Sequence, residues 1–310
     1  MKIIRPVTVD ETRLVTSNVA ESEYPIYSSG ASYAKGDRCY VPANHTVYEA
    51  AVAVSGVDPV DDVATAKTPK WLRVGATNRW AMFDGKIGTG TTAAEPWAVG
   101  DGVGIQVEVQ PGAVINGVAF FGLVADAVTV EVIDDYEGTV YSRRRSLISS
   151  AGIDSWYSWF FEPIERDTDL VLDDLPSYGS ATLRISIDRE GAPATCGLVV
   201  IGAQRKIGHL KWGAQPGITD YSRKGRDVFG RPEIVPRGFS KILSADVDID
   251  TQRVDAVLKM LAGYRSTALV WIGAIQYSST ILYGYFRDFT PVLDNRIFSE
   301  ISIDIEGLNE

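Results

Sequence analysis

Apolar and polar positions alternate with their clearest period near the C-terminus of the chain. Between residues 251 and 263 the apolar side chains recur at intervals of three and four, which is typical of a helix packed through one face. These positions are Val254, Val257, Leu258 and Leu261. Thr251 is the expected N-cap and Gly263 the expected end of the helix. We therefore expect Leu258 to be buried against a sheet.

Strand-like alternation flanks this helix on both sides. Residues 242–249 and 297–305 alternate apolar and polar side chains, as half-buried antiparallel strands do. The pattern predicts one helix lying on a β-sandwich or a curled sheet, within a C-terminal α+β domain of residues 238–310.

The middle of the chain, residues 77–205, contains a series of short strand-like segments. They occupy residues 103–109, 113–123, 128–133, 139–142, 169–172, 181–187 and 196–203. Turn-forming sequences such as DDYEG, LPSYGS and DREGAP separate them. This spacing predicts an antiparallel β-sandwich or jelly-roll domain, and it makes the chain as a whole mainly all-β.

Two smaller units precede this domain. Residues 1–23 predict an N-terminal strand followed by a polar arm, and such a strand is often held by pairing with another element. Its apolar positions are Ile3, Ile4, Val7 and Val9. Residues 24–76 predict a small β module with strands at 39–41 and 47–54, closed by Trp71. A unit of this size buries little core, so aromatic side chains must do much of its packing.

The densest aromatic cluster lies at residues 156–161. If this segment were a strand, Trp156 and Phe160 would face one side, and Tyr157, Trp159 and Phe161 the other. One face is then core. The other, which includes Trp159, is expected to be an interface with a neighbouring domain or subunit; a sugar-binding platform is the alternative.

Composition and charge narrow the classes of function. The chain has 310 residues and a formal net charge of -10, which disfavours nucleic acid as a partner because the phosphate backbone requires a concentrated positive surface. The N-terminal sequence MKIIRPVTVDETRL reaches charged residues within a few positions, so we expect neither a signal peptide nor insertion into a membrane. Two cysteines and two histidines without metal-ligand spacing predict no zinc site, no disulfide framework and no cofactor.

Residues 206–237 form a basic linker in an otherwise acidic chain. This segment shows little periodicity, and structureless connections of such length usually carry function or lie against a partner. Its cations include Arg223, Lys224, Arg226, Arg231 and Arg237. A positive belt on a negative body suits head-to-tail contact between copies of the chain, and the alternative is a solvated loop with scattered charge.

Catalytic residues are not evident in the sequence. Glycoside hydrolysis needs only two suitably spaced carboxylates, but the adjacent acidic pairs fall where turns are expected. These pairs are Asp61–Asp62, Asp134–Asp135 and Asp173–Asp174. No GxSxG elbow, GxGxxG segment or Walker A segment occurs. We therefore expect a non-catalytic protein.

Part of the small module resembles the chitin- and cellulose-binding modules that are appended to glycoside hydrolases and to phage tail proteins. The residues that carry this resemblance are Tyr33, Gly36–Asp37, Tyr48–Glu49–Ala50, Pro59, Trp71 and Gly75. Where that family usually has an early tryptophan, this chain has Tyr24 or Tyr27. The resemblance implies that aromatic rings stack on pyranose rings, with Tyr27, Tyr33, Tyr48 and Trp71 as the candidates. The alternative is that these rings form the core of the module.

The segment from residue 207 to residue 308 is similar in overall pattern to phage tail proteins encoded near the tail tip or baseplate. Its sequences IGHLKWG, DYSRKGRDVFGRP, VPRGFSK, LVWIG, YGYFRDF and IEGL follow in that order, with one helix between the third and the fourth. The resemblance implies a structural virion subunit, assembled in the host cytoplasm, that forms or decorates a ring at the distal end of the tail. Its partners would be copies of itself, other tail proteins and host cell-surface polysaccharide. The alternative is a free-standing glycan-binding or glycan-cleaving protein.

Overall fold

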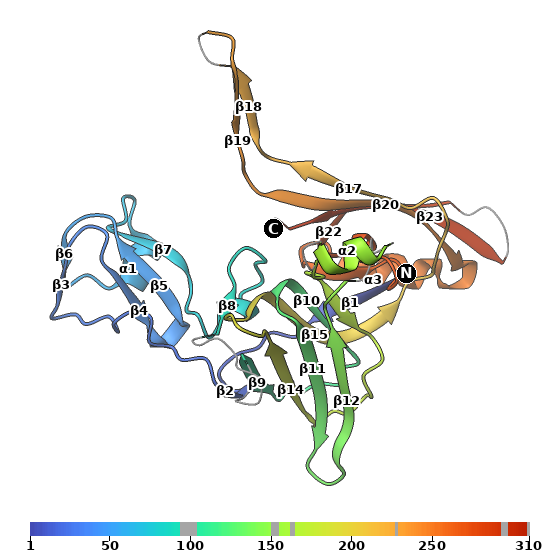
Figure 1. Ribbon diagram of the computed structural model, residues 1–310, viewed down its shortest axis with the longest axis horizontal. Coiled ribbons are helices and arrows are strands. Elements are labelled where there is room, and N and C mark those ends of the chain that lie inside the picture. The colour runs from blue at the N-terminus through green and yellow to red at the C-terminus, as the bar shows by residue number, and fades with distance from the viewer. Residues whose placement is uncertain (94–103, 150–154, 162–164, 227–228, 293–296, 309–310) are drawn as a thin grey trace.

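The computed structural model describes residues 1–93, 104–149, 155–161, 165–226, 229–292 and 297–308. Within these residues the protein is built mainly of antiparallel strands, with a few short helices (Figure 1). The mainly all-β fold class expected from the alternation of apolar and polar positions is confirmed.

A β-sandwich forms the centre of the molecule. One layer has the strand order β12-β11-β14-β9-β2. Its strands are β2 (Leu14–Ser17), β9 (Ile105–Val109), β11 (Ala127–Asp134), β12 (Gly138–Ser146) and β14 (Thr182–Asp188). The facing strands are β8 (Thr91–Thr92), β10 (Gly117–Val124), β13 (Leu170–Leu172) and β15 (Thr195–Lys206). Inward residues of both layers, such as Phe120, Val130 and Ile185, share one core. The strands expected between residues 103 and 203 are therefore present, but the one expected at 113–123 begins only at Gly117. Residue 103 lies outside the described residues.

The N-terminal strand β1 (Lys2–Pro6) joins the sandwich to the C-terminal part of the chain. It pairs with β15 on one side and with β21 (Leu269–Ile272) on the other, so that Lys2 lies opposite both Lys206 and Ile272. The result is one eleven-stranded sheet. Ile3 and Ile4 are buried in cores on opposite faces of this sheet, as alternation along a strand requires. The predicted pairing of the N-terminal strand is confirmed.

The C-terminal strands curl around the helix α3 (Val254–Gly263). They are β20 (Phe239–Asp250), β21, β22 (Ile281–Val292) and β23 (Phe298–Gly307), and a 3-10 turn, η4 (Ser278–Thr280), precedes β22. Val254, Val257 and Leu261 of α3 are buried, as expected. Leu258 is 42% exposed, so its predicted burial is wrong: it lies at the margin of the apolar face rather than at its centre.

The start of this helix also differs from the expectation. A 3-10 turn, η3 (Thr251–Arg253), precedes α3, and its N-cap is Asp250, whose carboxylate accepts a hydrogen bond from the Gln252 N–H. Thr251 is therefore not the N-cap. Gly263 is the last residue of α3, which agrees with its expected position.

The segment expected to be a structureless basic linker is made largely of strands. β16 (His209–Leu210) and β17 (Gln215–Asp220) pair with β20, and β18 (Arg223–Arg226) pairs with β19 (Pro232–Val235). The β18–β19 hairpin projects away from the body of the molecule (Figure 1). We call this hairpin the arm.

The small module lies to one side of the sandwich (Figure 1). Its elements are β3 (Ser32–Tyr33), β4 (Arg38–Val41), η1 (Pro42–Asn44), β5 (Thr46–Ala50), β6 (Val54–Ser55), α1 (Pro59–Thr65) and β7 (Trp71–Ala76). The strands predicted at 39–41 and 47–54 are present, although the second ends at Ala50. Asp61 and Asp62 lie in the first turn of α1, capped by Asp58, and not in an open turn as expected.

Residues 156–161 form a short helix, α2 (Trp156–Phe161), so the alternation of a strand does not apply to them. All five aromatic residues of α2 are exposed, so the expectation that one face of this segment is core is wrong. With an aromatic ring at nearly every position, the segment has no alternation that distinguishes a strand from a helix. A further 3-10 turn, η2 (Ala81–Phe83), follows the small module.

Candidate functional site

The aromatic rings of the small module are packed into its core. Trp71 is 1% exposed and Tyr48 is 4% exposed, and the indole Nε1–H of Trp71 donates a hydrogen bond to the Val57 carbonyl at 3.1 Å. Neither ring presents a face to solvent, so the sugar-stacking role predicted for Trp71 and Tyr48 does not fit this structure. Trp71 and Tyr48 instead form part of the core of the module, which was the alternative to sugar binding, because the module has few other large side chains to bury.

Tyr27 and Tyr33 pack against Trp71 and are half-buried. Their rings stack with centroids 5.9 Å apart, and Tyr33 meets Trp71 edge-on at 5.0 Å. The Tyr33 hydroxyl accepts a hydrogen bond from the Ser28 N–H at 2.8 Å. Saccharide contact by Tyr27 and Tyr33 stays a prediction, and both residues are only partly buried.

The arm carries the basic residues that were expected to contact a neighbouring subunit. Arg223, Lys224 and Arg226 lie on β18, and every residue of β18 and β19 is exposed. Arg231 precedes β19, and Arg237 follows it. The Lys224 ammonium lies 2.8 Å from Asp220 and holds the pKa of that carboxyl well below its usual range. The structure brings these cations together on one projecting hairpin.

Apolar side chains accompany the cations on the arm. Ile234 is 65% exposed and Phe229 is 83% exposed. A two-stranded hairpin is marginally stable in water by itself, because it has no second layer against which to bury its side chains. The arm therefore has the composition of a surface that gains by contact with a partner.

The helix α2 presents a second exposed aromatic surface. Its rings pair at a spacing of four residues: Trp156 lies 6.3 Å from Phe160, and Tyr157 lies 4.9 Å from Phe161. Trp159 is 62% exposed. We call these side chains the α2 patch. The role of Trp159 at a subunit interface stays a prediction, and an exposed cluster of large apolar rings is consistent with it.

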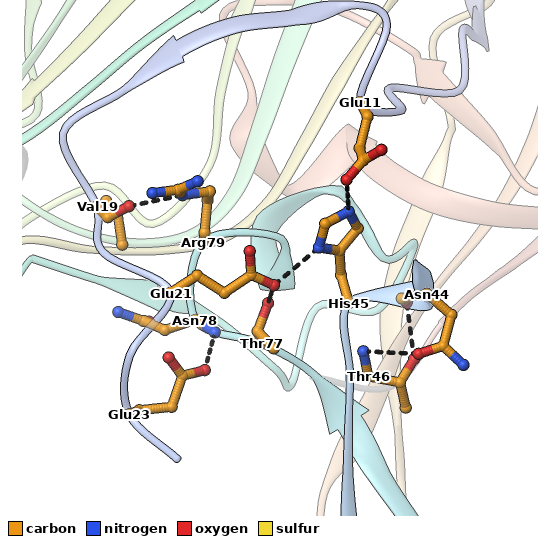
Figure 2. Close-up of polar contacts among 10 residues, drawn as sticks. All are labelled: Glu11, Val19, Glu21, Glu23, Asn44, His45, Thr46, Thr77, Asn78 and Arg79. Carbon is orange, nitrogen blue, oxygen red and sulfur yellow. Dashed lines mark hydrogen bonds and ion pairs between the residues drawn. The ribbon is translucent and has the colours of Figure 1, made fainter. Parts of the chain in front are cut away.

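A polar junction connects the small module to the N-terminal segment, residues 1–23 (Figure 2). Sequence reasoning did not reveal it. At its centre is His45, which has a left-handed φ of 50° directly after η1. Its Nδ1 lies 2.8 Å from Oε1 of Glu21, and the same oxygen accepts a hydrogen bond from the Thr77 hydroxyl at 2.7 Å. The imidazole stacks on the indole of Trp80, with centroids 4.4 Å apart.

Further hydrogen bonds fix the two sides of this junction. The Asn78 N–H donates to Glu23 at 2.5 Å, and Arg79 Nε donates to the Val19 carbonyl at 2.8 Å (Figure 2). The Asn78 side chain also exchanges two hydrogen bonds with the backbone of Thr92, in β8 of the sandwich. The module is therefore held to the body by polar contacts rather than by a shared apolar core.

A cleft of about 530 Å³ opens beside the junction. It is lined by residues 9–12 of the N-terminal segment, by residues 43–46 of the module, and by Arg73, Ala76, Trp80, Phe83 and Asp84 in and just after β7. No local sequence pattern could reveal it, since its lining comes from three segments that are far apart in the chain.

The two cysteines and the adjacent acidic residues Asp173 and Asp174 are buried or ion-paired within the fold. Cys39 and Cys196 are buried thiols, and burial raises the pKa of Cys39 to about 11 and that of Cys196 to about 12. Asp173 lies 2.5 Å from Lys2, and Asp174 pairs with Arg143. Within the described residues no cluster of three or more His, Cys, Asp or Glu side chains could hold a metal ion. None of the helices in the described part of the chain is long and apolar enough to cross a membrane.

No protein-family model matches the chain, and no curated protein matches it in sequence.

Proposed function

We propose that this chain is a non-catalytic structural subunit of a phage tail, located in the distal tail, tail tip or baseplate region of the virion. The observation that supports an assembling subunit best is the exposed arm. Every residue of β18 and β19 is exposed, so the cations and the apolar side chain of Ile234 on these two strands are not buried against the β-sandwich. Contact with another copy or with another tail protein would bury them.

Charge supports contact between copies in particular. The arm is basic, whereas the chain as a whole has a formal net charge of -10. An arm on one copy that contacts the body of the next is a heterologous contact, which closes into a ring when the rotation between copies is suitable. The α2 patch supplies a second apolar surface for such contacts, with Trp159 as a candidate anchor.

The small module supports the second part of the proposal, binding of host cell-surface polysaccharide. The half-buried pair Tyr27 and Tyr33 offers limited ring surface, so a single module would bind weakly. Many modules on one particle would multiply that affinity, provided that their spacing lets them bind one surface together. A free-standing glycan-binding or glycan-cleaving protein is the competing function, and it can be a monomer.

The oligomeric state tests this proposal. We expect the purified chain to form a ring or a defined oligomer by light scattering and by electron microscopy. Replacing Arg223, Lys224 and Arg226 by glutamate should reduce the assembled fraction and make the remainder more sensitive to salt. The matched control applies the same change of charge to the exposed residues Lys35, Lys67 and Lys70 of the small module.

Two results would contradict the proposal. A parent protein that stays monomeric at all concentrations, alone and with other tail proteins, would favour the free-standing function. Equal assembly by the arm variant and the control variant across a salt series would remove the arm from the interface.

A further inference from the structure

Within the described residues, one face of the C-terminal sheet has no second layer over much of its area. The alternating isoleucines of β23, which include Ile303, point toward α3 and are buried. The residues between them point to the opposite side. We call the side of β20, β22 and β23 that faces away from α3 the outer face. Its exposed side chains include Ser244, Asp246, Asp288, Thr290, Ser302 and Asp304.

Carboxylates lie directly opposite one another at two places on the outer face. Asp248 of β20 lies opposite Glu300 of β23, and the ammonium of Lys211 bridges them, 4.0 Å from the first and 2.8 Å from the second. Asp304 of β23 lies opposite Asp288 of β22, and neither forms an ion pair with another described residue. Like charges directly opposite each other in a sheet are destabilising. A cation of the described part of the chain therefore compensates the first pair but not the second.

The two faces of the arm differ in charge. Directly opposite residues of an antiparallel pair share a face, so Lys224 lies with Ile234, and Arg226 lies with Pro232. Positions 224 and 226 are two residues apart, so they also share this face. Glu233 of β19 lies on the other face. One face of the arm is therefore basic and apolar, without a carboxylate from β18 or β19.

Hydrogen bonds hold the arm at its root. The Tyr221 hydroxyl donates to the Glu306 carboxylate at 3.2 Å and lies 3.1 Å from the Ser240 hydroxyl. On the other strand, the Arg237 N–H donates to the Ser222 hydroxyl at 3.1 Å. These contacts restrict the direction of the arm before it meets a partner, which lowers the entropic cost of binding. The arm projects away from the body of its own copy (Figure 1).

Charge and spacing match the arm to the outer face. Residues that share a face of a strand are about 7 Å apart on both surfaces, so a ribbon laid along β20 and β23 brings alternate cations beside alternate carboxylates. We infer that the outer face of one copy is the docking surface for the arm of a second copy, with Lys224 and Arg226 compensating the charge around Asp304. This inference rests on the proposed assembly through the arm, and it names the surface that receives the arm.

Two further features of the outer face favour a protein segment over a metal ion. Val292 lies opposite Glu300 on this face and is 55% exposed, and Phe298 is 54% exposed. Such apolar side chains gain from contact with Ile234 of the arm. No described group of three or more acidic side chains is close enough together to hold a metal ion. The carboxylates are instead spread along strands, as the cations of the arm are.

Charge reversals on the two surfaces test this contact in the full-length protein. The arm variant carries Lys224→Glu and Arg226→Glu, and the face variant carries Asp246→Lys and Asp304→Lys. In sedimentation velocity each variant should associate about tenfold more weakly than the parent. A chain with all four changes should associate more strongly than either variant, because the exchanged charges attract again.

A matched control and a measurement of stability separate this contact from general effects of charge and folding. The control variant, Asp135→Lys with Glu190→Lys, makes the same change of charge at exposed positions of the sandwich and should associate as the parent does. Asp304→Lys by itself places a cation opposite Asp288, so the melting temperature should equal or exceed that of the parent while association weakens.

Mixing the arm variant with the face variant shows which surfaces meet. The intact arm of the face variant can dock on the intact outer face of the arm variant, so the mixture should form a 1:1 complex and no larger species. A mixture that stays monomeric, or a four-fold variant that associates no better than the two double variants, would overturn the assignment.

The remaining outcomes distinguish this inference from the proposed function. Weaker association of the arm variant together with parent-like association of the face variant overturns the outer face as the docking surface, but leaves assembly through the arm in place. A parent protein that stays monomeric at all concentrations overturns both the docking surface and the proposed contact between copies.

Discussion

Two leucines of α3 provide a test of the packing described for the C-terminal sheet. Leu261 is 1% exposed and belongs to the core that α3 shares with β20, β21, β22 and β23, whereas Leu258 is 42% exposed. The substitutions Leu261→Ala and Leu258→Ala remove the same atoms from the same helix and change helix propensity equally. Any difference in stability between the two variants therefore reports the burial of the two side chains and not the nature of the substitution.

The expected magnitudes follow from the two environments. A fully buried leucine replaced by alanine loses its transfer free energy and leaves a cavity, which together cost about 2–5 kcal/mol. Leu258 is only partly removed from water, and solvent can fill the space that its side chain leaves. Its replacement should therefore cost about 1 kcal/mol, since burying a whole leucine contributes about 1.5–3 kcal/mol.

Hydrogen exchange followed by mass spectrometry is the suitable assay, because a chain with several sheets need not unfold in one two-state transition. Peptides from β20 and β23 should lose protection in Leu261→Ala and retain most of it in Leu258→Ala. Equal loss in the two variants, or greater loss in Leu258→Ala, would show that the orientation of α3 has been misassigned.

Three further predictions concern other parts of the chain. Gly202→Ala should disrupt the pairing of β1 and lower the melting temperature, because an added Cβ would lie 1.8 Å from the Arg5 carbonyl oxygen; Gly225→Ala, where the space is open, should not. Cys196, whose pKa burial raises to about 12, should react with a thiol reagent at pH 8 only after unfolding, and reaction in the native state would contradict its burial. Trp71→Ala should destabilise the small module by about 3–5 kcal/mol, as measured by limited proteolysis; an unchanged cleavage pattern would show that Trp71 is not its core.

Most of the fold could be predicted from the sequence, because the strands of the sandwich show a period of two and α3 shows a period near four. Leu258 shows the limit of that reasoning. Its spacing places it on the apolar stripe, but the width of the stripe that is actually covered depends on the curvature of the sheet around it. Similarly, residues 156–161 have almost no polar positions, so their sequence shows neither the period of a strand nor that of a helix, and the alternation of a strand was the wrong basis for assigning their faces.

The candidate site was less accessible to sequence reasoning. The rings at Trp71 and Tyr48 could be recognised as important, but a sequence does not distinguish a ring that fills a core from a ring that contacts a ligand. His45 belongs to no recognisable motif in the sequence, and its partners Glu21 and Thr77 lie in separate segments that only the folded chain brings together. The arm was recognised by its charge. Its strand pairing was not predicted, because glycines, prolines and cations interrupt the alternation of apolar and polar residues that indicates a strand.

The position of β1 has a kinetic consequence. Until this strand is in place, β15 and β21 each have one edge without a partner, and the slot between them is closed only when Lys2 meets both Lys206 and Ile272. Contacts of such long sequence separation form slowly, and open edges invite pairing with other chains. The slot makes the same hydrogen bonds with the β1 of a neighbouring molecule as with its own. Refolding from dilute solution should therefore give chains that close on themselves, whereas refolding at high concentration should give strand-exchanged species of equal local structure.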